Sequence, residues 1–303
     1  MGKNISPLEK GDLVLIITPA KAIEKKDVDA AVTLFENWGL KVEVGKNALG
    51  KHHYFSATDQ KRAEDLQWAL DHPKAKAIVC ARGGYGTIRI VHQVDYAKFS
   101  ELPKWMIGFS DITVLHNKMN CDLTLPSIHA VAPLYFDRLD EGGETLMTLK
   151  NAMFGESYRI TFNSGARSVN GRTEGELIGG NLAILESLIG TNLDIETKGK
   201  ILFLEDVSEY AYKLDRMLWS LKYSGKLDNL KGLIIGGFTD IKSADETFGC
   251  TVEDLILEVV GDKNYPIAFD FPAGHQLDNR ALILGKTHVL QVEGEFSFLE
   301  CIE

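Results

Sequence analysis

The chain has 303 residues, 45% of them hydrophobic, which is enough to form the cores of two domains of ordinary size. Its 33 Lys and Arg against 43 Asp and Glu give a formal net charge of -10, which disfavours nucleic acid and anionic lipid as partners. The first residues contain no apolar signal segment and no later apolar run is long enough to span a bilayer, so we expect a cytoplasmic protein that binds neither nucleic acid nor a membrane.

The first half of the chain alternates between strand-like and helix-like patterns. Apolar periodicity predicts strands at Asp12–Pro19, Lys41–Val44, Ala77–Ala81 and Trp105–Gly108, and helices at Asp27–Trp38, Thr58–Leu70 and Asp111–Lys118. This alternation with short connections indicates a parallel sheet covered by helices on both faces. Because such sheets bind ligands outside the carboxyl ends of their strands, side chains in the turns that follow strands are the first candidates for a functional site.

A polar, glycine-containing stretch over 151–172 predicts a linker between domains. Beyond it the patterns predict strands at Glu176–Ile178, Lys200–Leu204, Leu233–Phe238, Ile267–Phe271 and Ala281–Val292, and helices at Asn181–Leu188 and Tyr212–Leu221. We therefore predict an N-terminal α/β domain over 1–150, the linker over 151–172 and a smaller, mixed α/β C-terminal domain over 173–303.

A glycine-rich turn, Ala81–Thr87, directly follows one of the predicted strands. Its three glycines allow backbone amides to approach an anion or a developing oxyanion closely; the alternative is a tight turn that merely requires positive φ. The turn is not a dinucleotide fingerprint, because Arg89 stands where GxGxxG requires its third glycine.

A second glycine segment, Gly45–Lys51, matches the first seven positions of a phosphate-binding P-loop. His52 then occupies the Ser/Thr position, and an imidazole cannot supply the hydroxyl that binds magnesium. We expect an exposed loop here. The chain also lacks HExxH, paired CxxC and EF-hand patterns, so neither a metal nor another cofactor is expected.

The strand pattern Trp105–Gly108 runs directly into Phe109, Ser110 and Asp111 and then into a helix pattern. A serine on such a turn is raised above the edge of the sheet, and the helix that follows it favours negative charge. The pattern is similar to a nucleophile elbow, although Ile112 replaces the last glycine of GxSxG. The alternative is that Ser110 or Asp111 only caps the helix.

A serine nucleophile needs a histidine base. His275 lies in a glycine-containing loop after a predicted strand, where catalytic bases are often found. His129 is a second candidate for a residue in a cleft, whereas His116 is expected to face away from the serine turn. An orienting acid is suggested at the end of Lys200–Val207, where Glu205 and Asp206 follow an apolar run; the alternative is a pair of solvated acids.

Taken together, these motifs resemble the LD-carboxypeptidase family, the S66 serine peptidases, over nearly the whole chain. The matching segments are Ala81–Gly86, Ile107–Asp111, Gly179–Leu182 with Ile189–Thr191, Leu204–Val207 and Phe271–His275. The resemblance implies a flavodoxin-like N-terminal domain and a smaller C-terminal domain. It also implies a catalytic triad of Ser110 as nucleophile, Glu205 as orienting acid and His275 as base. By the same resemblance, the backbone amides of Gly84 and Asp111 form the oxyanion hole.

The same resemblance implies a function in murein recycling, namely hydrolysis of the bond between an L-centre (lysine or meso-diaminopimelate) and a terminal D-alanine in muropeptides. It further implies a homodimer. Three alternatives remain open: an immunity-type amidase that cleaves peptidyl or aminoacyl nucleotide antibiotics, a non-catalytic module that holds a carboxylate or phosphate in the glycine turn, and a nucleotide-dependent enzyme.

Overall fold

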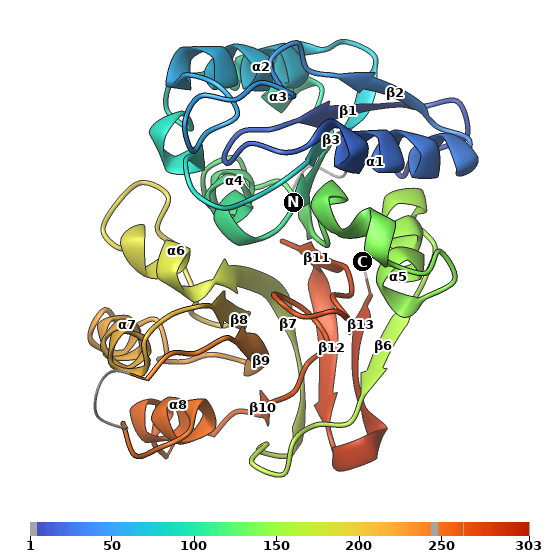
Figure 1. The fold of residues 1–303 in the computed structure, drawn as a ribbon. Coiled ribbons are helices and arrows are strands. Elements are labelled where there is room, and N and C mark those ends of the chain that lie inside the picture. Colours follow the sequence, from blue (N-terminus) through green and yellow to red (C-terminus); the bar gives the residue numbers. More distant parts are fainter. Residues whose placement is uncertain (1–4, 244–247, 263, 303) are drawn as a thin grey trace. The chain divides into compact units, whose positions relative to one another are not determined.

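The computed structural model describes residues 5–243, 248–262 and 264–302, and its chain divides into two compact units (Figure 1). Unit 1 comprises residues 1–157 and 280–283, and unit 2 comprises 158–279 and 284–303. The boundary after residue 157 falls inside the predicted linker over 151–172, but that stretch is not a linker, and residues 280–283 of the predicted C-terminal domain belong to unit 1. That stretch contains the end of helix α5 (Glu144–Phe154), strand β6 (Arg159–Phe162) and the first residues of another strand. β6 forms in a polar stretch because its polar residues alternate with buried apolar ones.

Unit 1 is built on a six-stranded sheet in the order β11-β5-β4-β3-β1-β2. Its strands are β1 (Leu13–Ile17), β2 (Lys41–Val44), β3 (Ala75–Cys80), β4 (Trp105–Gly108), β5 (Ser127–His129) and β11 (Leu282–Leu284). The pairs β1 with β2, β1 with β3, β3 with β4, and β4 with β5 are all parallel. This 2-1-3-4-5 order is that of flavodoxin-like folds, which confirms the fold predicted for this part of the chain.

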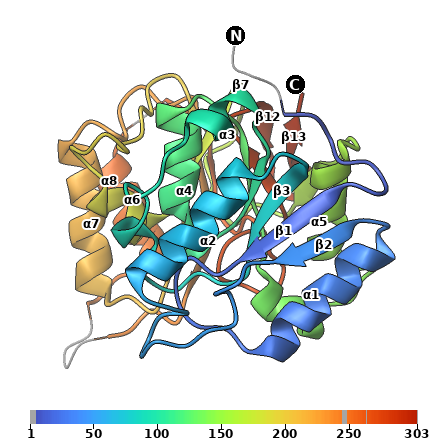
Figure 2. The same ribbon diagram turned by 90° about the horizontal axis from the view of Figure 1, so that it is seen from above.

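Helices cover both faces of the unit 1 sheet, with α2, α3 and α4 on one side and α1 and α5 on the other (Figure 2). Besides α5, these helices are α1 (Lys25–Asn37), α2 (Asp59–Asp71), α3 (Ala97–Glu101) and α4 (Thr113–Asn117). Helix α1 buries Val28, Ala31, Leu34 and Phe35, whose spacing of three and four residues forms one apolar stripe. Thr58 caps α2 as predicted, because its side chain accepts a hydrogen bond from the amide of Lys61.

Unit 2 contains a seven-stranded sheet in the order β10-β9-β8-β7-β12-β13-β6. Besides β6, its strands are β7 (Gly171–Asn181), β8 (Ile201–Val207), β9 (Gly232–Thr239), β10 (Ile267–Ala268), β12 (Thr287–Val292) and β13 (Ser297–Cys301). β7 to β10 pair in parallel, whereas β12 pairs antiparallel with both β7 and β13, as β13 does with β6. The mixed α/β character predicted for this part is confirmed.

Three helices accompany the parallel half of the unit 2 sheet (Figure 1). They are α6 (Leu182–Ser187), α7 (Ala211–Tyr223) and α8 (Val252–Val260). The strand predicted at Ala281–Val292 is two strands, since Gly285 adopts φ 81° and turns the chain between them. Over the residues that the structure describes, no helix is both long and apolar enough to cross a membrane, and no three His, Cys, Asp or Glu side chains are grouped as they would be around a metal ion.

Candidate active site

Ser110 lies at the carboxyl end of β4, on the turn that precedes α4. Its φ is 64°, in the left-handed region that a residue with a side chain seldom adopts and that costs on the order of 1–3 kcal/mol. The short 3-10 helix Ser110–Ile112 has Phe109 as its N-cap, and no side chain supplies a cap hydrogen bond there. The alternative that Ser110 or Asp111 only caps a helix is therefore wrong. A strained serine at this position is what a nucleophile elbow requires.

The glycine turn packs directly against this elbow, because it follows β3 and β3 is the neighbour of β4 in the sheet. A methyl group at Gly83 would lie 2.8 Å from Cβ and 3.1 Å from Oγ of Ser110, so only glycine fits there. Gly84 follows with φ 105°. The two sequence motifs of unit 1 thus come together at one place on the sheet edge, although they are more than twenty residues apart in the chain.

Asp111, next to the serine, points its carboxylate into the protein. Its side chain is buried and its Oδ2 accepts hydrogen bonds from the amide of Thr87 at 2.9 Å and from Thr87 Oγ1 at 2.6 Å. Burial raises the pKa of the Asp111 carboxyl above its ordinary value, while the donors of Thr87 oppose that rise. The residue therefore connects the serine turn to the end of the glycine turn.

Two of the histidines considered as site residues belong to the core of unit 1. His129 is fully buried on β5 with its ring 6.0 Å from those of Phe109 and His116, so the prediction that it lies in a cleft is wrong. His116 Nε2 lies 2.9 Å from the carbonyl oxygen of Gly108, and its Nδ1 lies 2.9 Å from Oγ of Ser127. Burial lowers the pKa of His116 to about 4, so this ring is neutral and supports the strand end that leads to the serine.

Glu205 and His275 form a pair in unit 2. Nδ1 of His275 lies 2.5 Å from Oε2 of Glu205, and the His275 amide donates to the same oxygen at 3.2 Å. Glu205 has no solvent exposure, and the side chain of His275 is 13% exposed. With Nδ1–H donated to the carboxylate, Nε2 of the neutral imidazole is the nitrogen able to accept a proton.

The local fold explains why these two side chains meet. The register between β8 and β9 shifts between Leu204 and Asp206, so Glu205 stands at an irregularity of the kind that redirects a side chain. The His275 loop lies beside the end of β9, where the amide of Gly237 donates to the carbonyl of Ala273 at 2.9 Å. Gly274 has φ 97°, and a methyl group there would lie 2.6 Å from Cβ of Glu205, so glycine allows the loop to approach the acid.

The pair shifts the titration of the histidine. Burial alone lowers the pKa of His275, but the negative charges of Glu205 and Asp206 and the hydrogen bond to Glu205 outweigh it, and the pKa is raised above its ordinary value of 6.5. The imidazolium that forms when His275 takes up a proton is therefore stabilised by an adjacent, fully buried carboxylate.

Asp206, the neighbouring acid, faces another element. Its Oδ1 accepts from Nδ2 of Asn181 at 2.9 Å and from the amide of Val207 at 2.8 Å, and its Oδ2 accepts from the amide of Ala183 at 3.0 Å. Burial, followed by the charge of Glu205, raises the pKa of Asp206 to about 6. Neither acid is the solvated side chain of the alternative interpretation, and Asp206 joins β8 to the start of α6.

The structure thus brings the predicted site residues together in two groups. Ser110, Asp111 and Gly84 belong to unit 1, whereas Glu205 and His275 belong to unit 2. Sequence reasoning missed the side chains that hold these groups in place, among them Arg62, Thr87 and Asn181. Thr87 and Asn181 lie in the segments Ala81–Thr87 and Gly179–Leu182 that the sequence singles out, but no role for their side chains follows from those motifs, and nothing in the local pattern around Arg62 distinguishes it from an ordinary surface residue.

Comparison with known proteins places both units in one family. Residues 14–130 match the model of the LD-carboxypeptidase N-terminal domain, and residues 174–290 match that of the LD-carboxypeptidase C-terminal domain. The murein tetrapeptide carboxypeptidase of Pseudomonas aeruginosa is 32% identical over 290 residues, which cover 92% of each chain.

Solved structures agree with this assignment. The muramoyltetrapeptide carboxypeptidase from Oxalobacter formigenes superimposes with a TM-score of 0.86 at 27% identity, covering 96% of this chain and 99% of that one. The microcin C7 self-immunity protein in its wild-type apo state superimposes with a TM-score of 0.87 over 99% of this chain and 98% of its own, but at 20% identity it shares the fold alone. The motifs, the two-unit fold and the matched models together show that the chain belongs to the LD-carboxypeptidase family of S66 serine peptidases.

Proposed function

We propose that the protein is a serine carboxypeptidase that removes the terminal D-alanine from muropeptides by hydrolysing the bond between the L-centre of the third residue and that D-alanine. The observation that carries the proposal is the 2.5 Å contact between the buried carboxylate of Glu205 and Nδ1 of His275. A strained serine set against a glycine turn in unit 1 supplies the matching nucleophile. The relatives named for murein peptides support the substrate class.

In the proposed reaction Ser110 Oγ attacks the carbonyl carbon while Nε2 of His275 takes its proton. Glu205 holds the imidazole in the required tautomer and stabilises the imidazolium. The backbone amides of Gly84 and Asp111 donate to the oxyanion, and the loss of one such donor typically costs about 10²- to 10³-fold in rate. His275 then protonates the leaving amine of D-alanine, and water hydrolyses the acyl-enzyme by the same steps in reverse order.

Release of free D-alanine from L,D-tetrapeptides tests the proposal directly. The tetrapeptides carry lysine or meso-diaminopimelate at the third position, and a tetrapeptide ending in L-alanine is the matched control. Turnover of the D-alanine peptides alone is the expected result. An aminoacyl nucleotide is assayed in parallel, and its hydrolysis without any release of D-alanine would replace this function by that of an immunity-type amidase. A protein that binds these peptides without hydrolysing any of them would be a binding module.

The pH dependence follows from the Glu205–His275 pair. The base acts in its neutral form, so kcat/KM is expected to be full above the pKa of His275 and to fall as the pH drops through it, with a midpoint above 6.5. In Glu205→Gln the anion is gone and burial remains, so the pKa of His275 should move down. NMR titration of the His275 ring in both proteins measures this shift. An unchanged His275 titration would contradict the assignment of Glu205 as its charged partner.

We further propose a cytoplasmic location and a homodimeric state, which the resemblance to the family and the expected role in murein recycling support. Cell fractionation and sedimentation at several protein concentrations test the two statements separately, since a monomeric enzyme would still carry out the reaction above.

A further inference from the structure

Arg62 on α2 is a buried cation that joins two loops at the carboxyl edge of the unit 1 sheet. The residue is 1% exposed. Its Nη1 donates to the carbonyl of Pro19, in the loop after β1, and to the carbonyl of Gly86, in the glycine turn after β3, the latter at 2.9 Å. One planar guanidinium therefore determines where the end of the glycine turn lies relative to the neighbouring loop.

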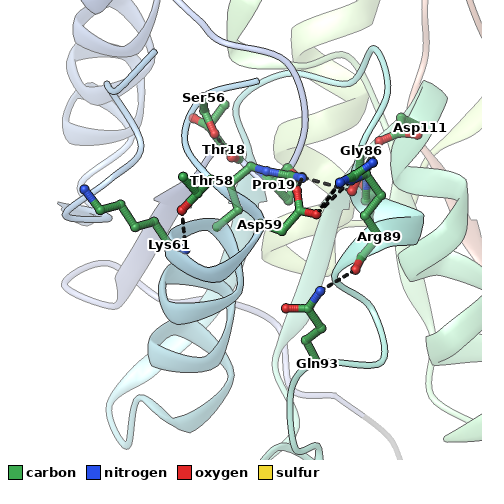
Figure 3. A network of polar contacts seen from close by, with 12 residues as sticks. Thr18, Pro19, Ser56, Thr58, Asp59, Lys61, Gly86, Arg89, Gln93 and Asp111 are labelled. Carbon is green, nitrogen blue, oxygen red and sulfur yellow. Dashed lines mark hydrogen bonds and ion pairs between the residues drawn. The ribbon is translucent and has the colours of Figure 1, made fainter. Parts of the chain in front are cut away.

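The guanidinium of Arg62 is itself held in position by Asp59 and Phe55. Asp59 accepts from Nη2 of Arg62 at 2.5 Å and, through its other oxygen, from Nε and Nη2 of Arg89 at 2.8 and 2.6 Å. The ring of Phe55 covers both guanidinium groups, at 4.7 Å from Cζ of Arg62 and 5.4 Å from Cζ of Arg89. Figure 3 shows Pro19, Asp59, Gly86 and Arg89 gathered at this point.

A second buried polar side chain, that of Asp111, holds the same end of the turn one residue further on. The Asp111 carboxylate accepts from both the amide and the hydroxyl of Thr87, which is also fully buried. The start of the turn is held as well, since the amide of Lys21 donates to the carbonyl of Gly83 at 3.3 Å. Gly83 is the residue at which any side chain would collide with Ser110. Side chains thus fix the turn at Gly86 and Thr87, a few residues after Gly83, the glycine that lies against the nucleophile.

These contacts have an energetic cost that packing alone does not require. Removing a guanidinium and a carboxylate from water costs several kcal/mol for each ion, and such buried charges are often no more stabilising than apolar side chains of the same size. Their contribution is to fix the positions of their partners, because a planar guanidinium and a carboxylate form hydrogen bonds in only a few geometries.

We propose that Arg62 and Asp111, the latter through the hydroxyl of Thr87, are positioning residues that hold the glycine turn in register with Ser110, so that the Gly84 amide is directed at the developing oxyanion. The proposal rests on the function given above. Neither side chain touches the substrate. An amide displaced by an ångström still permits binding but stabilises the transition state less, so the effect should fall on kcat and leave KM almost unchanged.

Four variants test the proposal: Arg62→Lys is compared with the control Lys104→Met, and Thr87→Val is compared with Thr87→Ser. Arg62→Lys keeps the charge but cannot make three hydrogen bonds in one plane, and we expect kcat to fall by about 10- to 100-fold with KM changed by less than about 3-fold. Thr87→Val keeps the shape and removes the hydroxyl, and we expect a fall in kcat of about 10-fold, which Thr87→Ser restores. Lys104→Met is the control for stability, because the buried Lys104 donates to the carbonyl of Leu70 at the opposite edge of the same sheet.

Each variant is measured in two assays. One follows D-alanine release, and the other follows the rate at which a fluorophosphonate modifies Ser110, since that adduct also places an oxygen among the oxyanion donors. We expect both rates to fall together in Arg62→Lys and Thr87→Val, and both to stay within about 2-fold of wild type in Lys104→Met even when its melting temperature drops.

The outcomes separate the two proposals. Wild-type rates in a folded Arg62→Lys or Thr87→Val protein would overturn the positioning role, as would an equal loss in Lys104→Met. If Arg62→Lys fails to fold, the nearly isosteric Thr87 variants test the positioning role on their own. A wild-type protein that is modified at Ser110 but releases no D-alanine overturns the proposed substrate while the labelling rates still test the positioning role. A wild-type protein that is neither modified nor active overturns both.

Discussion

Replacing Ser110 by alanine is expected to lower kcat for D-alanine release by about 10⁴-fold or more while the protein stays folded. Only substrate binding and the oxyanion donors would remain, and these alone give a small part of the acceleration of a serine hydrolase. Alanine tolerates the left-handed backbone no worse than serine, so the turn should keep its shape. D-alanine release, together with mass spectrometry of the fluorophosphonate adduct, measures the loss.

Ser6→Ala is the matched control, because this exposed serine also lies in unit 1 but outside the site, and its activity and labelling should equal those of the wild type. Ordinary turnover by a folded Ser110→Ala protein would exclude Ser110 as the nucleophile. A wild-type adduct on another serine would lead to the same conclusion by a separate route.

Glu205→Gln is expected to reduce kcat by about 10³- to 10⁴-fold with little change in KM. The amide of glutamine can present its NH₂ to Nδ1 of His275, which favours the tautomer with the proton on Nε2, and that tautomer cannot accept the proton of Ser110. The negative charge that stabilises the imidazolium is lost as well. Steady-state kinetics on one tetrapeptide, with circular dichroism to confirm folding, measures the effect.

Asp206→Asn should give the opposite pattern. The carboxylate of Asp206 accepts three hydrogen bonds from Asn181, Ala183 and Val207, and an amide in its place turns an NH₂ toward at least one of these donors. We therefore expect a loss of about 1–3 kcal/mol in the free energy of unfolding and a change in kcat of less than about 10-fold. A nearly normal Glu205→Gln beside an inactive Asp206→Asn would show that the acid has been assigned to the wrong residue.

Much of the fold could be predicted from the sequence, because many of its strands are short apolar or alternating runs bounded by glycine, proline or charged residues. β2 and β4 have the predicted bounds, and Thr58 caps α2 as expected. Elements with weaker patterns were not predicted, for example β5, which has only three residues, and α8, whose capping box at Thr251 and Asp254 is a signal that could have found it.

The side chains that build the site could be predicted only where a motif carries them. Ser110, Glu205 and His275 stand at strand ends in recognisable segments. Arg62 does not, because within an amphipathic helix an arginine looks like any solvated residue, and its partners are the carbonyls of Pro19 and Gly86, which lie 43 and 24 residues away. Parity along β8 could not distinguish Glu205 from Asp206, since the run before them is apolar on both faces and the shift in register with β9 is a tertiary feature.

The position of β11 in the sequence affects folding during synthesis and the design of fragments. This strand lies at the edge of the unit 1 sheet beside β5, yet it is encoded after β10 of unit 2. During synthesis the outer edge of β5 therefore has no partner strand until most of the second unit has left the ribosome. The unpaired backbone groups of such an edge can pair with strands of other chains. A fragment cut at the boundary after residue 157 keeps that edge permanently open, so the two units cannot be separated by dividing the gene at one point.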